Sequence, residues 1–197
     1  MDNDDHEDDV YPPAEDTYLL LDAALAEASP EDLVLEIGSG RGILSVDLAP
    51  KVRRLIATDI NPHAIRVTKD RARARAMAGT VELVRADLFR GISGCFDLVL
   101  FNPPYLPINP EERTGRWIDY ALDGGANGRE TVERFLKDLS THLRPGGRAL
   151  LLISSHTGIR EVQETACASG LTAIVVASKR CFFEQLYVLK ITATDSL

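Results

Sequence analysis

Short apolar runs alternate with helix-like segments along most of the chain, and this alternation constrains the fold more than any other feature. Strands that alternate with helices favour a mostly parallel sheet with helices on both faces. The sequence therefore predicts an α/β, Rossmann-like fold built on a mostly parallel seven-stranded sheet. The expected strands are 33–37, 54–58, 81–85, 98–101, 149–154, 171–177 and 185–191, and the expected helices are 15–28, 42–49, 61–77, 129–143 and 158–169.

Acidic residues gather at the start of the chain. The 197 residues carry a net charge of -8, and residues 2–9 contain six acids and no Lys or Arg. Such a run predicts a disordered, solvated tail over residues 1–9, followed by a single domain over residues 10–197. No basic face that could grip a phosphate backbone is evident, so no direct nucleic-acid partner is expected.

Cysteine usage and hydropathy give a cytoplasmic expectation. Cys95, Cys167 and Cys181 are far apart in sequence, which predicts neither a disulfide framework nor a metal site and fits a reducing compartment. No run approaches the length of a membrane span, and the acidic start does not resemble a secretory signal. We therefore expect a cytoplasmic protein without membrane contact.

A glycine-rich loop follows the first expected strand. Residues 36–42 read EIGSGRG, with the spacing G-x-G-x-G rather than the G-x-G-x-x-G of dinucleotide-binding loops. Gly38 and Gly40 permit a ligand to approach the backbone closely. Glu36 suits a cationic amine better than a pyrophosphate. Taken alone, the loop is equally compatible with a purely structural turn.

Aspartates end the next two expected strands. In parallel sheets ligands bind beyond the carboxyl ends of the strands, where Asp59 is placed to accept the hydroxyls of a ribose. Asp87 is placed to accept an adenine amino group, with the amide of Leu88 beside the ring. The structural alternatives are a helix cap for Asp59 and a turn residue for Asp87. Together with Glu36, these residues describe a site for S-adenosyl-L-methionine.

The tetrapeptide Asn102-Pro103-Pro104-Tyr105 follows the fourth expected strand. Two consecutive prolines fix two φ angles and hold the preceding residues extended. The Asn side chain and nearby backbone carbonyls then form fixed acceptors for a planar NH₂ group, with an aromatic ring beside them. The alternative is a rigid turn.

These motifs, in this order, resemble the archaeal and eukaryotic HemK-type glutamine methyltransferases, within the class I S-adenosyl-L-methionine-dependent methyltransferases. The resemblance covers roughly residues 10–191, and the main departure is Pro13, where a Glu is common. Its most specific parts are the PAEDT and GGANGR stretches. The matching segments are VYPPAEDTYLLL at 10–21, EIGSG at 36–40, TDINP at 58–62, FNPPY at 101–105 and DGGANGRE at 123–130.

The resemblance implies an activity and a set of roles. The activity is N5-methylation of the glutamine side chain in the Gly-Gly-Gln motif of a class I peptide-chain release factor, without a metal. The implied cofactor is S-adenosyl-L-methionine. The implied cofactor-binding residues are Thr17, Glu36, Gly38, Gly40, Asp59, Asp87, Leu88 and Asn102, and the implied catalytic and substrate-binding residues are Asn102, Pro103, Pro104 and Tyr105.

Other activities remain compatible with these motifs. A nucleic-acid N6-adenine methyltransferase uses the same tetrapeptide, although the acidic composition and the absence of a target-recognition domain argue against it. A protein lysine methyltransferase is compatible as a second activity. A non-catalytic S-adenosyl-L-methionine-binding subunit is a further alternative, which the intact Asn-Pro-Pro-Tyr disfavours.

The resemblance also implies a partner, a small zinc-binding methyltransferase activator that forms a one-to-one heterodimer. In the usual strand order of this fold, residues 81–85 lie at a sheet edge, where a partner could add a strand. Residues 106–127, with Arg113, Arg116 and Trp117, are long enough to form a substrate loop.

Overall fold

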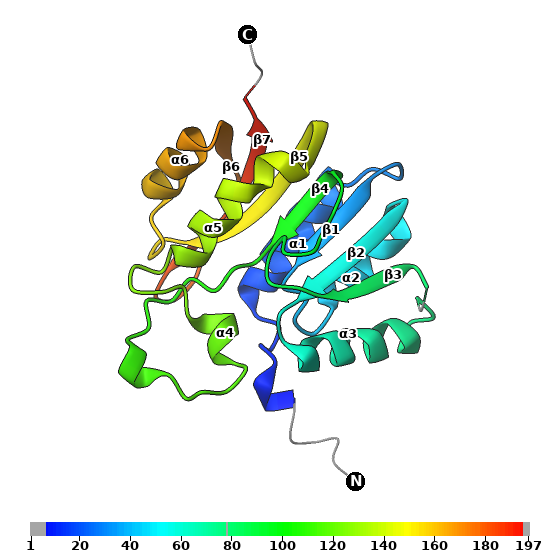
Figure 1. The fold of residues 1–197 in the computed structure, drawn as a ribbon, viewed down its shortest axis with the longest axis horizontal. Helices are drawn as coiled ribbons and strands as arrows, with labels where there is room; N and C mark the ends of the chain where they lie inside the picture. The colour runs from blue at the N-terminus through cyan, green and yellow to red at the C-terminus, as the bar shows by residue number, and fades with distance from the viewer. Residues whose placement is uncertain (1–6, 78, 195–197) are drawn as a thin grey trace.

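The computed structural model of the chain describes residues 7–77 and 79–194. Seven strands form one sheet within these residues: β1 (Leu33–Ile37), β2 (Arg54–Asp59), β3 (Val81–Arg85), β4 (Phe96–Phe101), β5 (Leu143–Ser154), β6 (Leu171–Arg180) and β7 (Gln185–Ala193). Their order across the sheet is β3-β2-β1-β4-β5-β7-β6 (Figure 1). The pairs from β3 to β5 are parallel, and β7 is antiparallel to both β5 and β6. The predicted fold class is confirmed, and so is the position of β3 at a sheet edge.

Helices cover both faces of this sheet. On one face lie α1 (Glu15–Glu27) and α2 (Ile43–Leu48), and α3 (Pro62–Ala74) packs against α2, β2 and β3. On the other face lie α5 (Glu130–Leu139) and α6 (Ile159–Ala168). The remaining elements are the short helix α4 (Asp119–Leu122) and the 3₁₀ helices η1 (Glu7–Asp9), η2 (Ala49–Lys51), η3 (Pro110–Glu112) and η4 (Ser140–His142).

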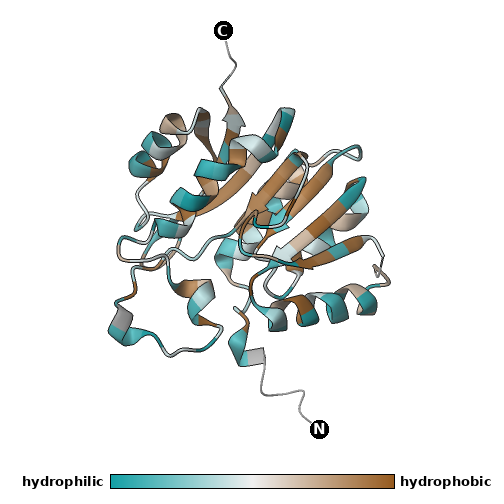
Figure 2. Ribbon diagram, viewed as in Figure 1, coloured by the Kyte–Doolittle hydropathy of each residue, from teal (hydrophilic) through white to brown (hydrophobic). Residues whose placement is uncertain are grey.

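Two hydrophobic cores follow from the alternation of side chains along the central strands. Leu98 and Leu100 of β4 face the α1 and α2 side, whereas Val99, between them, faces α5 and α6. Because both faces are covered, the central strands are apolar almost throughout, as Figure 2 shows in brown. The helix α5 buries Val132, Phe135, Leu136 and Leu139, a spacing that gives one apolar face toward the sheet.

The expected disorder of residues 1–9 is wrong at its end. Glu7–Asp9 form η1, and the carbonyl oxygen of Asp9 accepts a hydrogen bond from Asn61 Nδ2 at 2.8 Å. The Asp9 carboxylate also forms an ion pair with Arg116, so the end of the acidic segment contacts the folded domain. The rest of the predicted tail, residues 1–6, lies outside the described residues.

The expected helix over 129–143 is also too long. The helix α5 ends at Leu139, and η4 leads directly into β5, which begins at Leu143 instead of residue 149. Leu143 pairs with Phe96, and the register with β4 then shifts before Arg148 pairs with Leu98. The Pro-Gly-Gly sequence at 145–147, a local helix-breaking signal, is therefore an irregularity inside a strand.

Two smaller differences complete the fold. The long connection after β4 contains η3 and α4, which the sequence did not predict. The hairpin β6–β7 extends beyond its expected ends, to Arg180 and Ala193. No helix in residues 7–77 or 79–194 is long and apolar enough to cross a membrane.

Candidate active site

The carboxyl ends of four strands meet at one edge of the sheet. Ile37 of β1 pairs with Thr58 of β2 and with Phe101 of β4, while Asp59 pairs with Arg85 of β3. The residues that follow therefore lie in one row, at the point where the strand order reverses beside β1. They surround a cleft of about 720 Å³, a size that suits a small ligand. All the predicted site residues line it: Thr17, Glu36, Gly38, Gly40, Asp59, Asp87, Leu88, Asn102, Pro103, Pro104 and Tyr105.

A carboxylate from the first helix holds Asn102. The side-chain Nδ2 of Asn102 donates to Asp16 Oδ2 at 3.1 Å, and Asp16 is only 3% exposed. Asp16 also accepts from the Tyr11 hydroxyl at 3.2 Å, from the Thr17 N–H at 2.6 Å and from the Thr17 hydroxyl at 3.2 Å. Because a carboxylate only accepts hydrogen bonds, it requires the NH₂ side of the Asn102 amide to face it. Asp16 thereby fixes the orientation of Asn102.

The carbonyl side of the same amide is left for a ligand. Asn102 Oδ1 is buried, and no hydrogen-bond donor in the described part of the chain reaches it. A buried acceptor without a donor costs about 1–3 kcal/mol, and such groups concentrate where a ligand completes them. Oδ1 is therefore a fixed acceptor for a ligand N–H group.

Two phenols lie beside this acceptor. Tyr105 follows the two prolines and is partly buried in the cleft wall, and Tyr11 donates to Asp16. Burial, and next the charge of Asp16, raise the pKa of both phenols above the ordinary value. The Glu184 carboxylate raises the pKa of each phenol further. Both phenols therefore keep their proton at neutral pH.

The DGGANGRE stretch holds the chain that leaves Tyr105. The N–H of Leu106 donates to the carbonyl of Leu122 at 3.0 Å, and the N–H of Gly124 donates to the carbonyl of Leu106 at 2.8 Å. Gly128 has a φ of +69°, and a Cβ atom there would lie 2.6 Å from the carbonyl oxygen of Tyr105. Only glycine permits this approach, so the stretch closes the base of the 106–127 loop against the Asn102–Tyr105 tetrapeptide.

A buried carboxyl group with a raised pKa stands just before the glycine loop. Glu36 at the end of β1 is 3% exposed and accepts a hydrogen bond from the Ser45 hydroxyl of α2. Burial raises the pKa of Glu36 to about 8. The Ser45 hydrogen bond lowers this pKa, and the charge of the nearby Asp59 raises it. Gly40, at a φ of +52°, has open space where a Cβ atom would lie. The loop thus leaves its backbone open to the cleft, above a carboxyl group that favours a cationic ligand.

Asp59 supports the glycine loop from β2. Its Oδ2 accepts from the N–H of Gly40 at 2.9 Å, and its Oδ1 accepts from the N–H of Asn61 at 2.8 Å. The backbone amide of Ile60 also reaches this carboxylate, which leaves acceptor capacity for a ligand hydroxyl. The alternative role of Asp59 as a helix cap is wrong, because Asn61 caps α3 by accepting from the N–H of His63 at 2.9 Å.

The segment after β3 completes the far end of the cleft. Asp87 Oδ2 accepts from Arg134 Nη2 of α5 at 2.7 Å on the surface. Leu88 is buried and has a φ of +50°, which is uncommon for a residue with a Cβ atom. Strained backbone of this kind concentrates at ligand-binding sites, where it directs an amide group.

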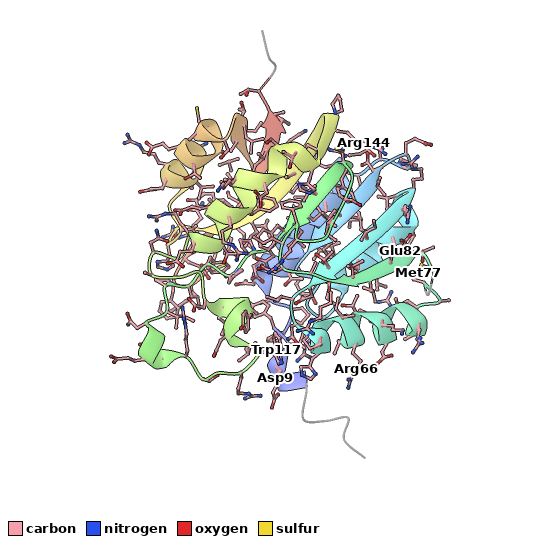
Figure 3. All side chains as sticks on the ribbon, viewed as in Figure 1. Asp9, Arg66, Met77, Glu82, Trp117 and Arg144 are labelled. Atoms are coloured by element: carbon pink, nitrogen blue, oxygen red, sulfur yellow. The ribbon has the colours of Figure 1, made fainter. Side chains whose placement is uncertain are left out.

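Residues of the 106–127 loop also line the cleft. Arg116 pairs with Asp9 of η1 at 3.0 Å, and Arg113 pairs with Asp123 at 2.6 Å. The guanidinium of Arg85 lies 5.4 Å from the centre of the Trp117 ring. Figure 3 labels Asp9 and Trp117, which project from η1 and from the loop on the same side of the molecule. The Arg116–Asp9 pair thus joins the loop to the start of the chain, and the Arg85–Trp117 contact joins it to β3.

Sequence reasoning missed three residues of the site. Asp16 and Tyr11 both lie in the segment 10–21, which the sequence analysis used only as a motif. The place of Asp16 next to Thr17, at the start of a helix, is the signal that could have found it. Glu184 lines the cleft from the β6–β7 hairpin and accepts from the Ser154 hydroxyl at 2.5 Å. Nothing in its local sequence marks it, because only the antiparallel hairpin brings it to the strand ends.

Comparisons with known proteins agree with this geometry. The family model of the methyltransferase small domain matches residues 15–114. Human methyltransferase HEMK2 is 37% identical to this chain, with 93% of this chain and 90% of the human protein aligned. A release factor glutamine methyltransferase of Cereibacter sphaeroides is 36% identical, with 85% of this chain and 62% of that protein aligned.

One solved structure resembles the chain along nearly its full length. It is the E. cuniculi Mtq2–Trm112 complex, responsible for methylation of the eRF1 translation termination factor. The TM-score is 0.74 at 28% identity, covering 94% of this chain and 99% of the solved one. The fold and the cleft thus define a class I methyltransferase domain. The chain belongs to the methyltransferase small domain family, among its HemK-type glutamine methyltransferases.

Proposed function

We propose that this chain transfers a methyl group from S-adenosyl-L-methionine to the side-chain amide nitrogen of a glutamine. The proposed substrate is the Gly-Gly-Gln motif of a class I peptide-chain release factor. The family membership supports the reaction class, since relatives that align over most of this chain are named HEMK2 and release factor glutamine methyltransferase.

The observation that carries the proposal is the hydrogen bonding of the Asn102 amide. Its Nδ2 donates to Asp16, whereas its buried Oδ1 accepts from no donor in the described part of the chain. A substrate carboxamide is planar and carries two N–H groups, one for Asn102 Oδ1 and one for the carbonyl of Pro103. Holding both hydrogens fixes the plane of the amide and stabilises the positive charge that develops on its nitrogen.

The residues of the glycine side fit S-adenosyl-L-methionine. When bound, this cofactor supplies an electrophilic methyl group. We assign Glu36 to its ammonium group and Asp59 to its ribose hydroxyls. Asp87 and the amide of Leu88 are assigned to the adenine, and Thr17 to the methionine portion. The open backbone at Gly40 and the buried, cation-favouring Glu36 support this assignment.

The contribution of the protein is mainly positional. Bringing two reactants together in line is worth up to about 7–11 kcal/mol in favourable cases. Asp16, Asn102 and the two prolines supply a rigid frame for one reactant, and the glycine loop with Asp59 supplies a frame for the other. The neutral phenols of Tyr11 and Tyr105 border the reacting amide without adding charge.

A small zinc-binding activator protein is the proposed partner, bound at β3. The support is the position of β3 at the sheet edge, where Val84 is 39% exposed, and the Mtq2–Trm112 pairing in the similar structure. An unpaired edge strand favours addition of a strand from another chain. We also propose a cytoplasmic location, because a translation termination factor works at the ribosome.

Mass spectrometry of a cognate release factor tests the proposed function. The chain, co-expressed with the activator, is incubated with the release factor and S-adenosyl-L-methionine. We expect a gain of one methyl group on the glutamine of Gly-Gly-Gln, and a rate at least ~100-fold lower for Asn102→Ala. A Gly-Gly-Asn release factor is the matched substrate control. Methylation at another residue, or none, contradicts the proposal.

A further inference from the structure

The turn between β6 and β7 presents two almost fully exposed phenylalanines. Phe182 is 92% exposed and Phe183 is 85% exposed, and their rings meet edge to face with centroids 4.6 Å apart. Turns are usually made of Gly, Asn, Asp, Pro or Ser, so an aromatic pair at this place has no local structural purpose. Covering an exposed aromatic pair with a partner is favourable in free energy, because it removes apolar surface from water.

This turn is fixed in place at both of its ends. The N–H of Cys181 donates to the carbonyl of Glu184 at 2.8 Å, which closes the turn. The N–H of Ser155, after β5, donates to the carbonyl of Gln185 at 2.7 Å. On the other side, Lys179 pairs with Glu15 of α1 at 3.3 Å. Hydrogen bonds and an ion pair therefore hold in place the turn that carries Phe182 and Phe183.

The turn borders the substrate end of the cleft. Glu184, next to Phe183 in the chain, lines the cleft together with Tyr105. The sheet order places β7 on the β5 side of β4, whereas Asp59 and Asp87 follow β2 and β3 on the opposite side of β1. Phe182 and Phe183 thus lie on the side of the cleft away from the residues assigned to ribose and adenine.

We propose that Phe182 and Phe183 dock the protein substrate, by contacting the polypeptide that flanks its methyl-accepting glutamine. This inference rests on the proposed function. A side chain on a large protein reaches Asn102 only if the flanking chain crosses the rim of the cleft. On the β5–β7 side that rim is the Cys181–Glu184 turn, so the flanking chain passes over the two rings. Aromatic anchors at the centre of a contact typically supply much of the binding energy.

A second exposed apolar group offers a matched control. Ile174 and Val175 on β6 are 54% and 45% exposed, at the sheet edge opposite β3. Like the two phenylalanines they are absent from the cleft lining, but unlike Phe183 they have no cleft-lining neighbour in the chain, so the same chemical change there tests exposure alone.

The experiment compares three double variants of the full chain, with the activator present. They are Phe182→Ser/Phe183→Ser, Phe182→Leu/Phe183→Leu and Ile174→Ser/Val175→Ser. Initial rates are measured against release factor concentration, and calorimetry gives the affinity for S-adenosyl-L-methionine. We expect the first variant to raise KM for the release factor at least about tenfold with kcat and cofactor affinity preserved. The KM of the leucine variant should lie closer to that of the wild type. The KM of the β6 variant should equal that of the wild type.

Each other outcome overturns the inference. An unchanged KM shows that the rings do not dock the substrate. Loss of the co-purified activator assigns the turn to that partner instead, and a dimer-to-monomer change in light scattering assigns it to a second copy of the chain. If the wild-type chain methylates no release factor, the proposed function fails and this inference fails with it. An active wild type with an unchanged variant refutes the docking role alone.

Discussion

Replacing Asp16 by Asn tests the most specific feature of the site. The carboxylate accepts from Asn102 Nδ2, from the Tyr11 hydroxyl and from two groups of Thr17. An Asn side chain has one accepting and one donating end. If it keeps the bonds to Thr17, it presents NH₂ to the NH₂ of Asn102. The anchor of Asn102 is then lost, while the shape of the residue is nearly unchanged.

The size of the effect follows from the bond that is lost. A hydrogen bond to a charged group contributes about 1.5–3 kcal/mol, which corresponds to a rate change of roughly 10- to 150-fold. We expect kcat for the release factor to fall by that factor. The affinity for S-adenosyl-L-methionine should change much less, because Glu36, Asp59 and Asp87 keep their geometry.

Single-turnover kinetics, calorimetry and a double-mutant cycle with Asn102→Ala form the assay. If Asp16 acts through Asn102, Asp16→Asn has little further effect in the Asn102→Ala background. Additive losses, or a kcat within twofold of wild type for Asp16→Asn alone, would refute the positioning role. The melting temperature separates a general structural role: the lost hydrogen bonds should lower it by several degrees in Asp16→Asn, but both single variants should remain folded at the assay temperature.

Three further predictions concern the cofactor residues and the sheet edge. Asp59→Ala should weaken S-adenosyl-L-methionine and S-adenosylhomocysteine alike, by about 1.5–3 kcal/mol, since both contain the ribose; unchanged calorimetric affinities contradict the ribose assignment. Because burial raises the pKa of Glu36 to about 8, the free protein holds a proton there at pH 7, and binding of a cationic ligand releases it. Affinity for S-adenosyl-L-methionine should therefore increase with pH by up to about tenfold per unit below pH 8 and level off above it. The Glu36→Gln variant should lose this pH dependence. Parallel pH profiles of affinity for the wild type and the variant would disprove the linkage. Val84→Asp should abolish co-purification of the activator without lowering cofactor affinity, and Val175→Asp at the opposite edge is its control; retained pairing in Val84→Asp argues against β3 as the interface.

The sequence predicted the parallel part of the fold well because its signals are local. The β1 and β3 strands match their expected bounds, since each is a short apolar run between polar or glycine residues. Parallel strands also align their carboxyl ends, so motifs at those ends were correctly expected to share one cleft.

The errors arose where distant contacts decide the structure. Pro145 and the glycines after it are local helix-breaking signals, yet pairing with β4 draws them into a strand. The acidic run has the composition of a solvated tail, but Asp9 is ordered by Arg116 and Asn61, more than fifty residues away in sequence. The contribution of Asp16 to Asn102 and that of Glu184 to the cleft depend on tertiary structure in the same way.

The contact between Asp16 and Asn102 has a consequence for synthesis of the protein. The frame around the substrate amide needs α1 from the start of the chain, β4 from its middle, and the Glu184 turn from near its end. A nascent chain that stops before the last hairpin lacks Glu184 and, with it, one wall of the cleft. The cleft is therefore complete only once the residues from α1 to Glu184 are all present in the folded chain.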